Sequence, residues 1–428
     1  MARFIIRGGK PLRGRFVPSG NKNAVLPMLA ACLLTDEQID LQNVPRIEDV
    51  LTMLKLLAGL GVEVSHRGSR VRLCARGLQK RVLDRELCLR VRSSILLSGP
   101  LAARHGMATL YPPGGDTIGR RRLDTHFMGL EALGIRVSAG AGCYRFTRKR
   151  LEGAFILLDE ASVTATENIM MAAALAPGAT VIFNAACEPH VQDLAALLNK
   201  MGARISGVGT NRLEIEGVKA LGGAKHEVCP DHVETGSFLA AAAITGGSLS
   251  VPCPDSLSVA PILRPLRTLG LRAAIEDGHL RLPQAKSLRI QYDRGRLIPK
   301  IEDGPWPSFP SDLMSIAIVT ATQAAGSVLF FEKMFESRMY FVDRLIDMGA
   351  RIIQCDPHRV LVTGHARLHA ERVSSPDIRA GMAMVLAALC AKGSSIIENA
   401  QVIDRGYERI EERLRALGAD IERDAGAA

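Results

Sequence analysis

The sequence predicts an α/β protein of two domains, built from six repeated α+β units with helices at the centre and sheets outside. Three observations lead to this fold class: a length of 428 residues, a hydrophobic content of 47%, and one phrase that recurs six times. The length suggests two or three domains, and the composition is ample for large cores. The recurring phrase is a helix ending in Leu or Met, followed by a glycine and then a strand.

The glycine of this phrase recurs at intervals of roughly 70 residues. A glycine at this place fits a left-handed helix C-cap, and the alternating residues after it fit a half-buried strand. Six such units form two domains of three units more naturally than one solenoid. The six glycines are Gly61, Gly134, Gly202, Gly270, Gly349 and Gly418.

Most units also contain a second, more apolar helix, which we expect at 24–34, 165–176, 236–245 and 312–325. Helices as apolar as 170–175 (Met-Met-Ala-Ala-Ala-Leu) need burial on nearly all sides, so we expect them at the centre of each domain. We expect one domain at 23–229 and the other at 1–22 plus 230–428. In this division the start of the chain supplies a strand to the second domain.

Composition and charge favour a small anionic substrate. The formal net charge is +10, but only 4% of residues are aromatic and the basic residues form no dense tract, so we expect no nucleic-acid partner. The nine cysteines occur singly, without a zinc-site spacing, which predicts reduced, mostly buried thiols and no metal or cofactor. No apolar run is long enough for a bilayer, and the start looks like a strand, so we expect a cytoplasmic protein without membrane contact.

The loop at 112–122 (Pro-Pro-Gly-Gly-Asp-Thr-Ile-Gly-Arg-Arg-Arg) is the most informative stretch. Prolines and glycines disfavour a regular helix or strand, and they place Asp116 next to Arg120, Arg121 and Arg122. Such a loop can hold an acid beside a bound anion. A solvated basic turn is the alternative interpretation, although glycines that permit close backbone approach are unnecessary in such a turn.

Two further motifs precede apolar helices. Lys22 lies near a helix N-terminus, where backbone amides and the helix dipole favour an anion; alternatively Asn23 is the N-cap and Lys22 is solvated. Residues Thr164 to Glu167 have the pattern of a capping box, so a helix should start there, and phosphate binding remains open.

The remaining candidates also have ordinary explanations. Asp312 follows a proline-rich loop and opens an apolar helix, which fits either an N-cap or a functional carboxylate. Arg92 also stands out, whereas Arg338 and the pair Asp404 and Arg405 could be ordinary surface charges. None of these motifs decides the function alone.

Together the motifs resemble the family of UDP-N-acetylglucosamine enolpyruvyl transferases over essentially the whole length. The resemblance implies an inside-out α/β barrel pair of two domains with three units each, which agrees with the sixfold count. The matching segments are 19–24 (Ser-Gly-Asn-Lys-Asn-Ala), 92–95 (Arg-Ser-Ser-Ile), 113–119 (Pro-Gly-Gly-Asp-Thr-Ile-Gly), 184–189 (Asn-Ala-Ala-Cys-Glu-Pro), 230–236 (Pro-Asp-His-Val-Glu-Thr-Gly), 309–312 (Phe-Pro-Ser-Asp) and 404–408 (Asp-Arg-Gly-Tyr-Glu).

This resemblance implies transfer of an enolpyruvyl group from phosphoenolpyruvate to the 3-hydroxyl of UDP-N-acetylglucosamine, with release of phosphate, in peptidoglycan synthesis. Asp116 would protonate the enol, Asp312 would take the proton of the attacking hydroxyl, and Lys22 would complete the catalytic set. Several fixed cations suit phosphoenolpyruvate because it carries a phosphate and a carboxylate close together. The implied substrate-binding residues are Asn23, Arg92, Arg121, Arg122, Asp124, Thr125, Ser162, Val163, Thr164, Arg338, Arg379 and Arg405.

Four positions depart from the family pattern. The proton donor is usually a cysteine and is here Asp116; a carboxyl group can donate a proton when its surroundings keep it protonated. We therefore expect resistance to fosfomycin, which alkylates the cysteine. Arg122 replaces a proline, Glu160 stands where a lysine can occur, and Thr164 replaces a glycine, and these three changes concern the acceptor half of the site.

Those changes leave two alternatives open. One is an enolpyruvyl transferase with another acceptor, such as a uridine nucleotide in secondary metabolism. Shikimate 3-phosphate is disfavoured because residues 19–23 lack a Gly-Ser-Lys-Ser pattern. The other alternative is a catalytically silent protein, which the retained cations and Asp312 disfavour.

Overall fold

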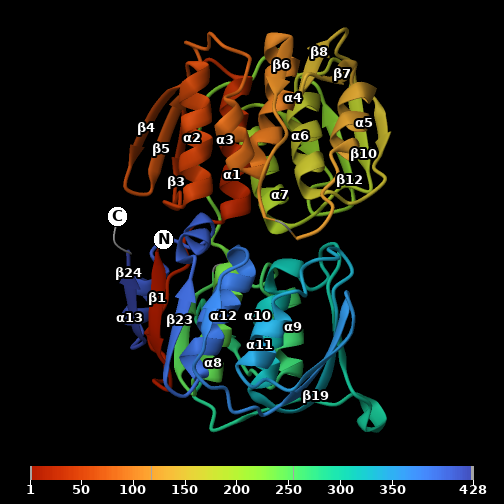
Figure 1. The fold of residues 1–428 in the computed structure, drawn as a ribbon. Coiled ribbons are helices and arrows are strands. Elements are labelled where there is room, and N and C mark those ends of the chain that lie inside the picture. Colours follow the sequence, from red (N-terminus) through yellow and green to blue (C-terminus); the bar gives the residue numbers. More distant parts are fainter. Residues whose placement is uncertain (1, 117, 254, 426–428) are drawn as a thin grey trace. The chain divides into compact units, whose positions relative to one another are not determined.

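The computed structural model describes residues 2–116, 118–253 and 255–425 (Figure 1). The chain separates into two compact units. Unit 1 comprises Met1–Pro18, Thr117–Arg120 and Asp231–Ala428, and unit 2 comprises Ser19–Asp116 and Arg121–Pro230. Within the described residues each unit contains three sheets, so every repeat of the sequence corresponds to one sheet.

The three sheets of unit 2 have the strand orders β13-β3-β5-β4, β6-β8-β7 and β11-β12-β10-β9. Strand β13 pairs in parallel with β3, which brings the last strand of this unit beside its first. The strands are β3 (Ile39–Gln42), β4 (Glu63–Arg67), β5 (Arg70–Cys74), β6 (Met107–Leu110), β7 (Ile135–Gly140), β8 (Cys143–Arg148), β9 (Phe155–Leu157), β10 (Ala179–Phe183), β11 (Arg204–Ser206), β12 (Arg212–Glu216) and β13 (Ala224–Glu227).

The three sheets of unit 1 have the orders β22-β23-β1-β24, β15-β16-β14-β2 and β17-β19-β21-β20, and β18 pairs with β19. The strands are β1 (Arg3–Arg7), β2 (Arg13–Arg15), β14 (Ser248–Pro252), β15 (Ala274–Glu276), β16 (His279–Leu282), β17 (Leu288–Arg289), β18 (Lys300–Glu302), β19 (Ala324–Phe331), β20 (Ile352–Asp356), β21 (Arg359–Gly364), β22 (Arg372–Ser374), β23 (Ser394–Glu398) and β24 (Asp420–Asp424).

The start of the chain contributes strands to unit 1, as the sequence predicts. Strand β1 lies antiparallel between β23 and β24, two strands of the last repeat. Strand β2 pairs in parallel with β14 of the fourth repeat. Figure 1 shows the red N-terminal strand β1 inside the blue C-terminal sheet.

The helices of unit 2 are α1 (Lys22–Ala31), α2 (Glu48–Leu60), α3 (Arg85–Arg90), α4 (Ser98–His105), α5 (Asp124–Ala132), α6 (Val163–Ala173) and α7 (Pro189–Lys200). Those of unit 1 are α8 (His232–Ile244), α9 (Ala260–Thr268), α10 (Met314–Thr322), α11 (Val342–Asp347), α12 (Ile378–Cys390) and α13 (Ile410–Ala416). Short 3₁₀ helices are η1 (Cys32–Leu34), η2 (Arg92–Leu97), η3 (Arg294–Arg296), η4 (Ser311–Leu313) and η5 (Ala400–Arg405).

The six glycines of the repeat adopt the left-handed conformation that the sequence predicts. Their φ angles lie between 84° at Gly134 and 104° at Gly418. They follow α2, α5, α7, α9, α11 and α13, and each precedes an outer strand. Because an L side chain rarely adopts this φ, glycine is the residue that permits the chain to leave the helix and enter the sheet.

The second helix of each repeat forms the centre of its unit. Every residue of α10 is buried, and almost every residue of α1, α6, α8 and α12 is buried too. The hydroxyl of Thr320 donates to the carbonyl of Ile316 at 2.7 Å, which satisfies a polar group inside the helix core. Outer strands such as β12 alternate exposed and buried residues. Helices therefore lie inside and sheets outside within each unit, as predicted.

The helix boundaries differ from the sequence prediction at four places. Helix α1 starts at Lys22 and continues as η1, α6 starts at Val163, α8 starts at His232, and α10 is preceded by the 3₁₀ helix η4. The capping-box prediction was wrong, because Ser162 is the N-cap of α6 and Thr164 lies inside the helix. The prediction of mostly buried cysteines was also too strong: all nine are free, but three are buried, five are half-buried and Cys355 is exposed.

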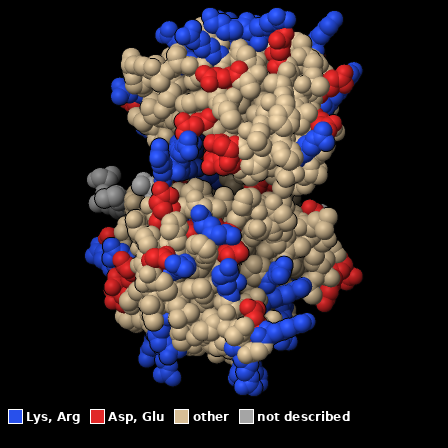
Figure 2. Space-filling model, turned by 90° about the vertical axis from the view of Figure 1, so that its right-hand side faces the viewer, with Lys and Arg blue, Asp and Glu red and all other residues tan. Residues whose placement is uncertain are grey.

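Two surface properties complete the description. Within the described part of the chain, no helix is long and apolar enough to span a bilayer. Figure 2 shows that on one face the Lys and Arg side chains occur in separate groups with Asp and Glu among them. The positive net charge is therefore dispersed over that face.

Candidate active site

Several of the predicted site residues lie at or next to the N-terminal ends of helices, a common feature that the sequence alone did not reveal. Lys22 is the first residue of α1, Arg92 begins the 3₁₀ helix that runs into α4, and Ser162 caps α6. In unit 1, Asp312 lies just before α10 and Arg379 is the second residue of α12. Helix N-termini carry unsatisfied backbone N–H groups and the positive end of the helix dipole, so they favour anions.

Asp312 is the centre of the cluster in unit 1. It is not an N-cap, since Pro310 holds that position, and its carboxylate instead pairs with Arg338 at 3.1 Å and with Arg379 at 2.8 Å. The two arginine side chains are only 5% and 6% exposed, whereas that of Asp312 is 28% exposed. Two buried guanidinium groups therefore hold a carboxylate that keeps access to solvent, a suitable arrangement for a proton acceptor.

Arg338 is buried and is therefore not the surface charge that its sequence context allowed. Its Nη2 donates to Asp312, while its Nε is buried and has no hydrogen-bond acceptor within the described residues. Buried donors normally have partners. Arg338 thus retains one donor that a bound anion could satisfy.

Arg379 is fixed on several sides. Its backbone N–H donates to the side chain of Asp377, which caps α12, at 2.8 Å. Its guanidinium lies 5.4 Å from the ring centroid of Tyr407, and the hydroxyl of Tyr407 lies 3.0 Å from that of Ser237 on α8. The N-terminal ends of α8, α10 and α12 therefore meet around Asp312.

His232, the first residue of α8, belongs to this cluster and was missed by sequence reasoning. Its ring packs against Trp306 at 5.7 Å between centroids. Burial lowers the pKa of His232 below its ordinary value, although Asp231 and Asp312 act in the opposite direction. A lone histidine at the start of an apolar helix gives no distinguishing signal in the sequence.

In unit 2 the arginine-rich loop closes around Arg92. The described residues of the loop at 112–122 have no helix or strand, as predicted. Arg92 Nη2 donates to the carbonyls of Arg121 at 2.7 Å and Arg122 at 3.0 Å. Burial, followed by the nearby charge of Arg121, lowers the pKa of Arg92 to about 10. Two like charges held together in this way favour the binding of an anion.

Glycines shape the base of this loop. Gly115 has a φ of +117°, and a Cβ there would lie 3.3 Å from Nη1 of Arg121. A Cβ on Gly114 would lie only 1.7 Å from the carbonyl oxygen of Leu89. Asp116 is half-buried directly after these two residues. Arg120, near the tip of the loop, belongs to unit 1. Its backbone N–H donates to Glu336 of the same unit at 2.9 Å.

Lys22 is buried and ion-paired, so the interpretation as a solvated lysine was wrong. Its Nζ lies 2.7 Å from Oδ2 of Asp49, a residue in the first turn of α2. The cap of α1 is Asn21, whose side chain accepts from the backbone N–H of Asn23 at 2.8 Å, so Asn23 is not the N-cap. Asp49 had not been singled out from the sequence, because one acid in a helix's first turn is common.

The residues predicted to contact the nucleotide sugar also converge within unit 2. Thr125 Oγ1 donates to Asp159 at 2.7 Å, and Thr164 Oγ1 lies 3.1 Å from Nε2 of His126. Burial lowers the pKa of His126 to about 3, so its ring is neutral. The start of α5, the turn at 159–160 and the start of α6 are thus linked by side chains. Asp124 at the start of α5 pairs with Arg122 at 2.6 Å.

Arg405 closes the last 3₁₀ helix of unit 1, η5. Its neighbour Asp404 is held by Arg423 at 2.6 Å, which fixes the end of that helix. The structure thus brings together Asp312, Arg338 and Arg379 in unit 1. In unit 2 it brings together Arg92, Arg121 and Arg122, and separately Asp124, Thr125 and Thr164.

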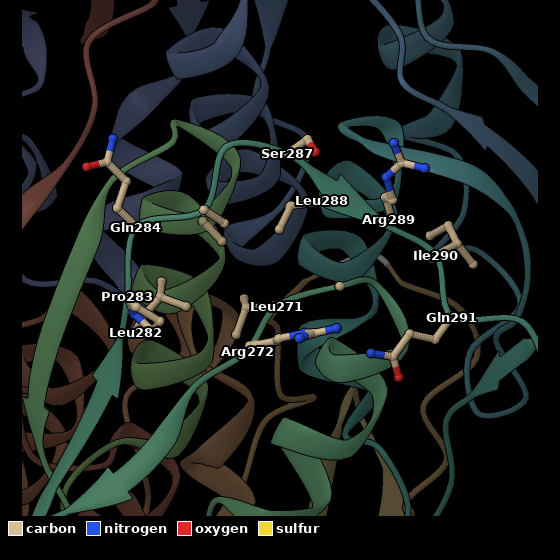
Figure 3. A pocket seen from close by; sticks show the side chains of 13 residues that line it. Leu271, Arg272, Leu282, Pro283, Gln284, Ser287, Leu288, Arg289, Ile290 and Gln291 are labelled. Atoms are coloured by element: carbon tan, nitrogen blue, oxygen red, sulfur yellow. The ribbon is translucent and has the colours of Figure 1, made fainter.

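A pocket of about 410 Å³ in unit 1 lies apart from these residues (Figure 3). Its lining combines apolar residues such as Leu271 and Leu288 with Arg272 and Arg289. It also includes Ala243, eleven residues along α8 from His232 and therefore about 16 Å away along the helix axis. None of the predicted site residues lines this pocket.

Comparison with known proteins identifies the class. The sequence profile of the EPSP synthase family, described as EPSP synthase (3-phosphoshikimate 1-carboxyvinyltransferase), matches residues 6–414, and the chain belongs to this family. The fold is that of a solved structure titled the enolpyruvyl transferase NikO from Streptomyces tendae, with a TM-score of 0.87, 22% identity and coverage of 99% of this chain and 98% of the other. EPSP synthase from Acinetobacter baumannii has a TM-score of 0.75 and 18% identity, over 99% of this chain and 100% of the other.

Within this family the chain is most informatively compared with proteins named UDP-N-acetylglucosamine 1-carboxyvinyltransferase. It is 52% identical to that of Bradyrhizobium diazoefficiens over 98% of both chains, and 51% identical to that of Treponema denticola over 99% of both chains. The resemblance found in the sequence is therefore confirmed over the full length.

Proposed function

We propose that the protein transfers the enolpyruvyl group of phosphoenolpyruvate to the 3-hydroxyl of UDP-N-acetylglucosamine and releases phosphate. The observation that carries this proposal is 52% identity, over 98% of both chains, to a protein named for this activity. The reaction is the first committed step of peptidoglycan synthesis, and we place it in the cytoplasm. We assign the two catalytic domains to 23–229 and to 1–22 plus 230–428.

The proposed phosphoenolpyruvate site uses four cations. Lys22, Arg121 and Arg405 bind its phosphate and carboxylate, and Arg92 adds a further positive charge. The hydrogen bonds from Arg92 to the loop carbonyls support this assignment, since they fix the loop that carries Arg121. A compact dianion requires several positive partners, and guanidinium groups can bind it bidentately.

The proposed acceptor site uses seven residues of unit 2 and two arginines of unit 1. In this proposal Asn23, Arg122, Asp124, Thr125, Ser162, Val163 and Thr164 contact the nucleotide sugar, and Arg338 and Arg379 also bind substrate. Thr164 directs its hydroxyl toward His126, 3.1 Å away. The replacement of glycine at this position therefore adds a side chain with a partner inside the unit, which supports tolerance of this departure.

The proposed chemistry is an addition followed by an elimination. Asp116 donates a proton to C3 of the enol, and the resulting electrophilic C2 is attacked by the 3-hydroxyl oxygen while Asp312 takes the hydroxyl proton. The tetrahedral intermediate then loses a proton from C3 and phosphate from C2, which restores the vinyl group. Donor and acceptor must stand on different sides of the reacting carbons.

A further consequence concerns inhibition. Fosfomycin reacts with a cysteine thiolate, and this chain has Asp116 at that position of the loop. We therefore propose that the enzyme resists fosfomycin. Covalent labelling of Asp116 by fosfomycin, with loss of activity, would contradict this assignment.

The test of the proposed function is acceptor-dependent release of phosphate from phosphoenolpyruvate. We expect turnover with UDP-N-acetylglucosamine and none with UMP, other UDP-sugars or shikimate 3-phosphate. Turnover with another acceptor alone would retain the phosphoenolpyruvate site and overturn the assignment to peptidoglycan synthesis. Phosphoenolpyruvate binding without turnover on any acceptor would indicate a silent member of the family.

A further inference from the structure

Two buried carboxyl groups lie side by side behind the Asp312 cluster. Strands β18 and β19 are parallel, with Glu302 opposite Phe331, and the residue that follows each strand is an acid, Asp303 and Glu332. Both side chains are fully buried. Oδ1 of Asp303 accepts from the backbone N–H of Lys333 at 2.5 Å, while its Oδ2 has no partner within the described residues apart from this neighbouring acid.

Glu332 is held in a protonated state by these surroundings. Burial and a side-chain hydrogen bond with Asp303 raise its pKa to about 9, and the opposing effects of Arg338 and Ser311 are smaller in total. His358 also lies near it, with its Nδ1 2.7 Å from the backbone carbonyl of Glu332. A protonated Glu332 can donate to Asp303 and still accept hydrogen bonds from elsewhere.

The acceptor oxygens of Glu332 hold both segments that carry the Asp312 pair. Ser311 Oγ donates to the two carboxyl oxygens of Glu332, at 2.8 and 3.0 Å, and Ser311 directly precedes Asp312. The backbone N–H of Phe335 donates to Oε1 of Glu332 at 3.2 Å. The ring of Phe335 in turn lies 5.1 Å below the guanidinium of Arg338.

These contacts form a closed ring. Glu332 fixes Ser311 on one side and Phe335 on the other, and the ring is completed by the 3.1 Å ion pair between Asp312 and Arg338. A side chain that reaches both segments determines where the carboxylate of Asp312 and the guanidinium of Arg338 stand relative to each other. Errors of about 1 Å in such positions reduce rates strongly.

We propose that Glu332, hydrogen-bonded to Asp303, is a positioning residue that aligns Asp312 with Arg338 through Ser311 and Phe335. It touches neither substrate in this proposal. Its mechanistic consequence rests on the proposed function, in which Asp312 receives the proton of the acceptor hydroxyl, but the alignment itself is a property of unit 1.

The test compares Glu332→Ala with Glu332→Gln. Glutamine offers a carbonyl oxygen to Ser311 and Phe335 and an amide donor to Asp303, so it reproduces the hydrogen bonds of a protonated glutamate. We expect Glu332→Gln to keep kcat within about 3-fold, and Glu332→Ala to lower kcat by about 10-fold or more with a small change in the KM for phosphoenolpyruvate. Ser311→Ala should lower kcat too, and its effect should not add to that of Glu332→Ala.

Asp40→Ala is the matched control, because Asp40 is a buried acid of unit 2 that pairs with Arg70 and Arg72 on an outer sheet. It should lower the melting temperature without lowering kcat. A Glu332→Ala variant with a lowered melting temperature and the kcat of the wild type would overturn the proposal. Equal defects in Glu332→Gln and Glu332→Ala would also overturn it, because the hydrogen bonds alone would then not be sufficient.

A second measurement does not depend on turnover. Amide hydrogen exchange, followed by mass spectrometry, should accelerate in Glu332→Ala at 309–315 and at 333–339 together, and remain as in the wild type in Glu332→Gln. Exchange that changes in neither segment would overturn the alignment. If the wild type shows no enolpyruvyl transfer while the exchange result is as expected, the proposed function fails and the positioning role stands.

The pH dependence of stability gives a third readout. The pKa of Glu332 is higher in the folded protein than its ordinary value of 4.5. Its stabilising contribution is therefore complete below about pH 4.5 and is lost as the pH rises through about 9. Wild type should lose stability relative to Glu332→Gln over this range, and a constant difference between them would contradict a protonated Glu332.

Discussion

Replacing Asp312 by asparagine tests the unit 1 cluster most sharply. The substitution keeps the shape of the side chain but removes the charge that faces Arg338 and Arg379, whose side chains are 5% and 6% exposed. Removing one partner of a fully buried ion pair costs about 3–5 kcal/mol. Because the Asp312 side chain is 28% exposed, solvent screens part of this effect, and we expect about 2 kcal/mol.

This free energy translates into a measurable melting shift. For a unit of this size about 2 kcal/mol corresponds to a lower Tm by about 4–8 °C. The loss of the proton acceptor should reduce kcat by about 100- to 10,000-fold. Both quantities follow from the same purified variant, by calorimetry and by the phosphate-release assay.

Asp40→Asn provides the control for charge removal alone. Asp40 is also a carboxylate between two arginines, but it lies on β3, away from the helix starts. Because Arg70 and Arg72 are 41% and 48% exposed, it should show a smaller loss of Tm, with an unchanged kcat. A kcat of Asp312→Asn within about 3-fold of the wild type would refute the role of Asp312 as the base.

Three further predictions concern unit 2. Asp116→Cys should retain turnover and become sensitive to fosfomycin, and a variant that stays insensitive would contradict the placement of Asp116 at the reacting position. Gly114→Ala should lower kcat/KM by about 100-fold, because the new Cβ would meet the carbonyl oxygen of Leu89 at 1.7 Å and displace the loop; Gly59→Ala, whose Cβ meets nothing within 4 Å, should be unaffected. For His126, the folded pKa of about 3 lies below the ordinary value of 6.5, so only the unfolded chain binds a proton between these values. The free energy of unfolding should therefore fall as the pH drops below about 6.5, by up to about 1.4 kcal/mol per pH unit. In His126→Gln, the free energy of unfolding from urea titrations should depend less steeply on pH.

The repeat architecture could be predicted because its signal is local. Each of the six glycines follows a helix by one or two residues and adopts a positive φ, so the pattern is visible in short windows of sequence. The burial of α10 follows from its composition in the same way, since nine apolar or hydroxyl-bearing residues offer no face to water.

The partners of the site residues could not be predicted because they are distant in the chain. Asp312 meets Arg379 across 67 positions, and Lys22 meets Asp49 from a different helix. The sequence shows each residue at a helix start, where capping is the common role. Which capping candidates point into a shared site depends on the packing of three helices, and no local pattern records it.

The errors have the same origin. Thr164 matched a capping box by spacing, but Ser162 starts the helix two residues earlier, and Thr164 meets His126 of α5 instead. Asp312 matched an N-cap, but two arginines that are 26 and 67 positions away in the chain take its oxygens. In both cases a tertiary partner replaced the local backbone partner that the pattern suggested.

The most direct test of the account is the product formed in deuterium oxide from phosphoenolpyruvate and UDP-N-acetylglucosamine. Mass spectrometry should find an enolpyruvyl ether of UDP-N-acetylglucosamine with deuterium on the vinyl carbon, because C3 gains a solvent-derived proton in the addition and loses one in the elimination. Release of phosphate with pyruvate as the only carbon product, or an ether that never contains deuterium, would contradict the proposed addition and elimination.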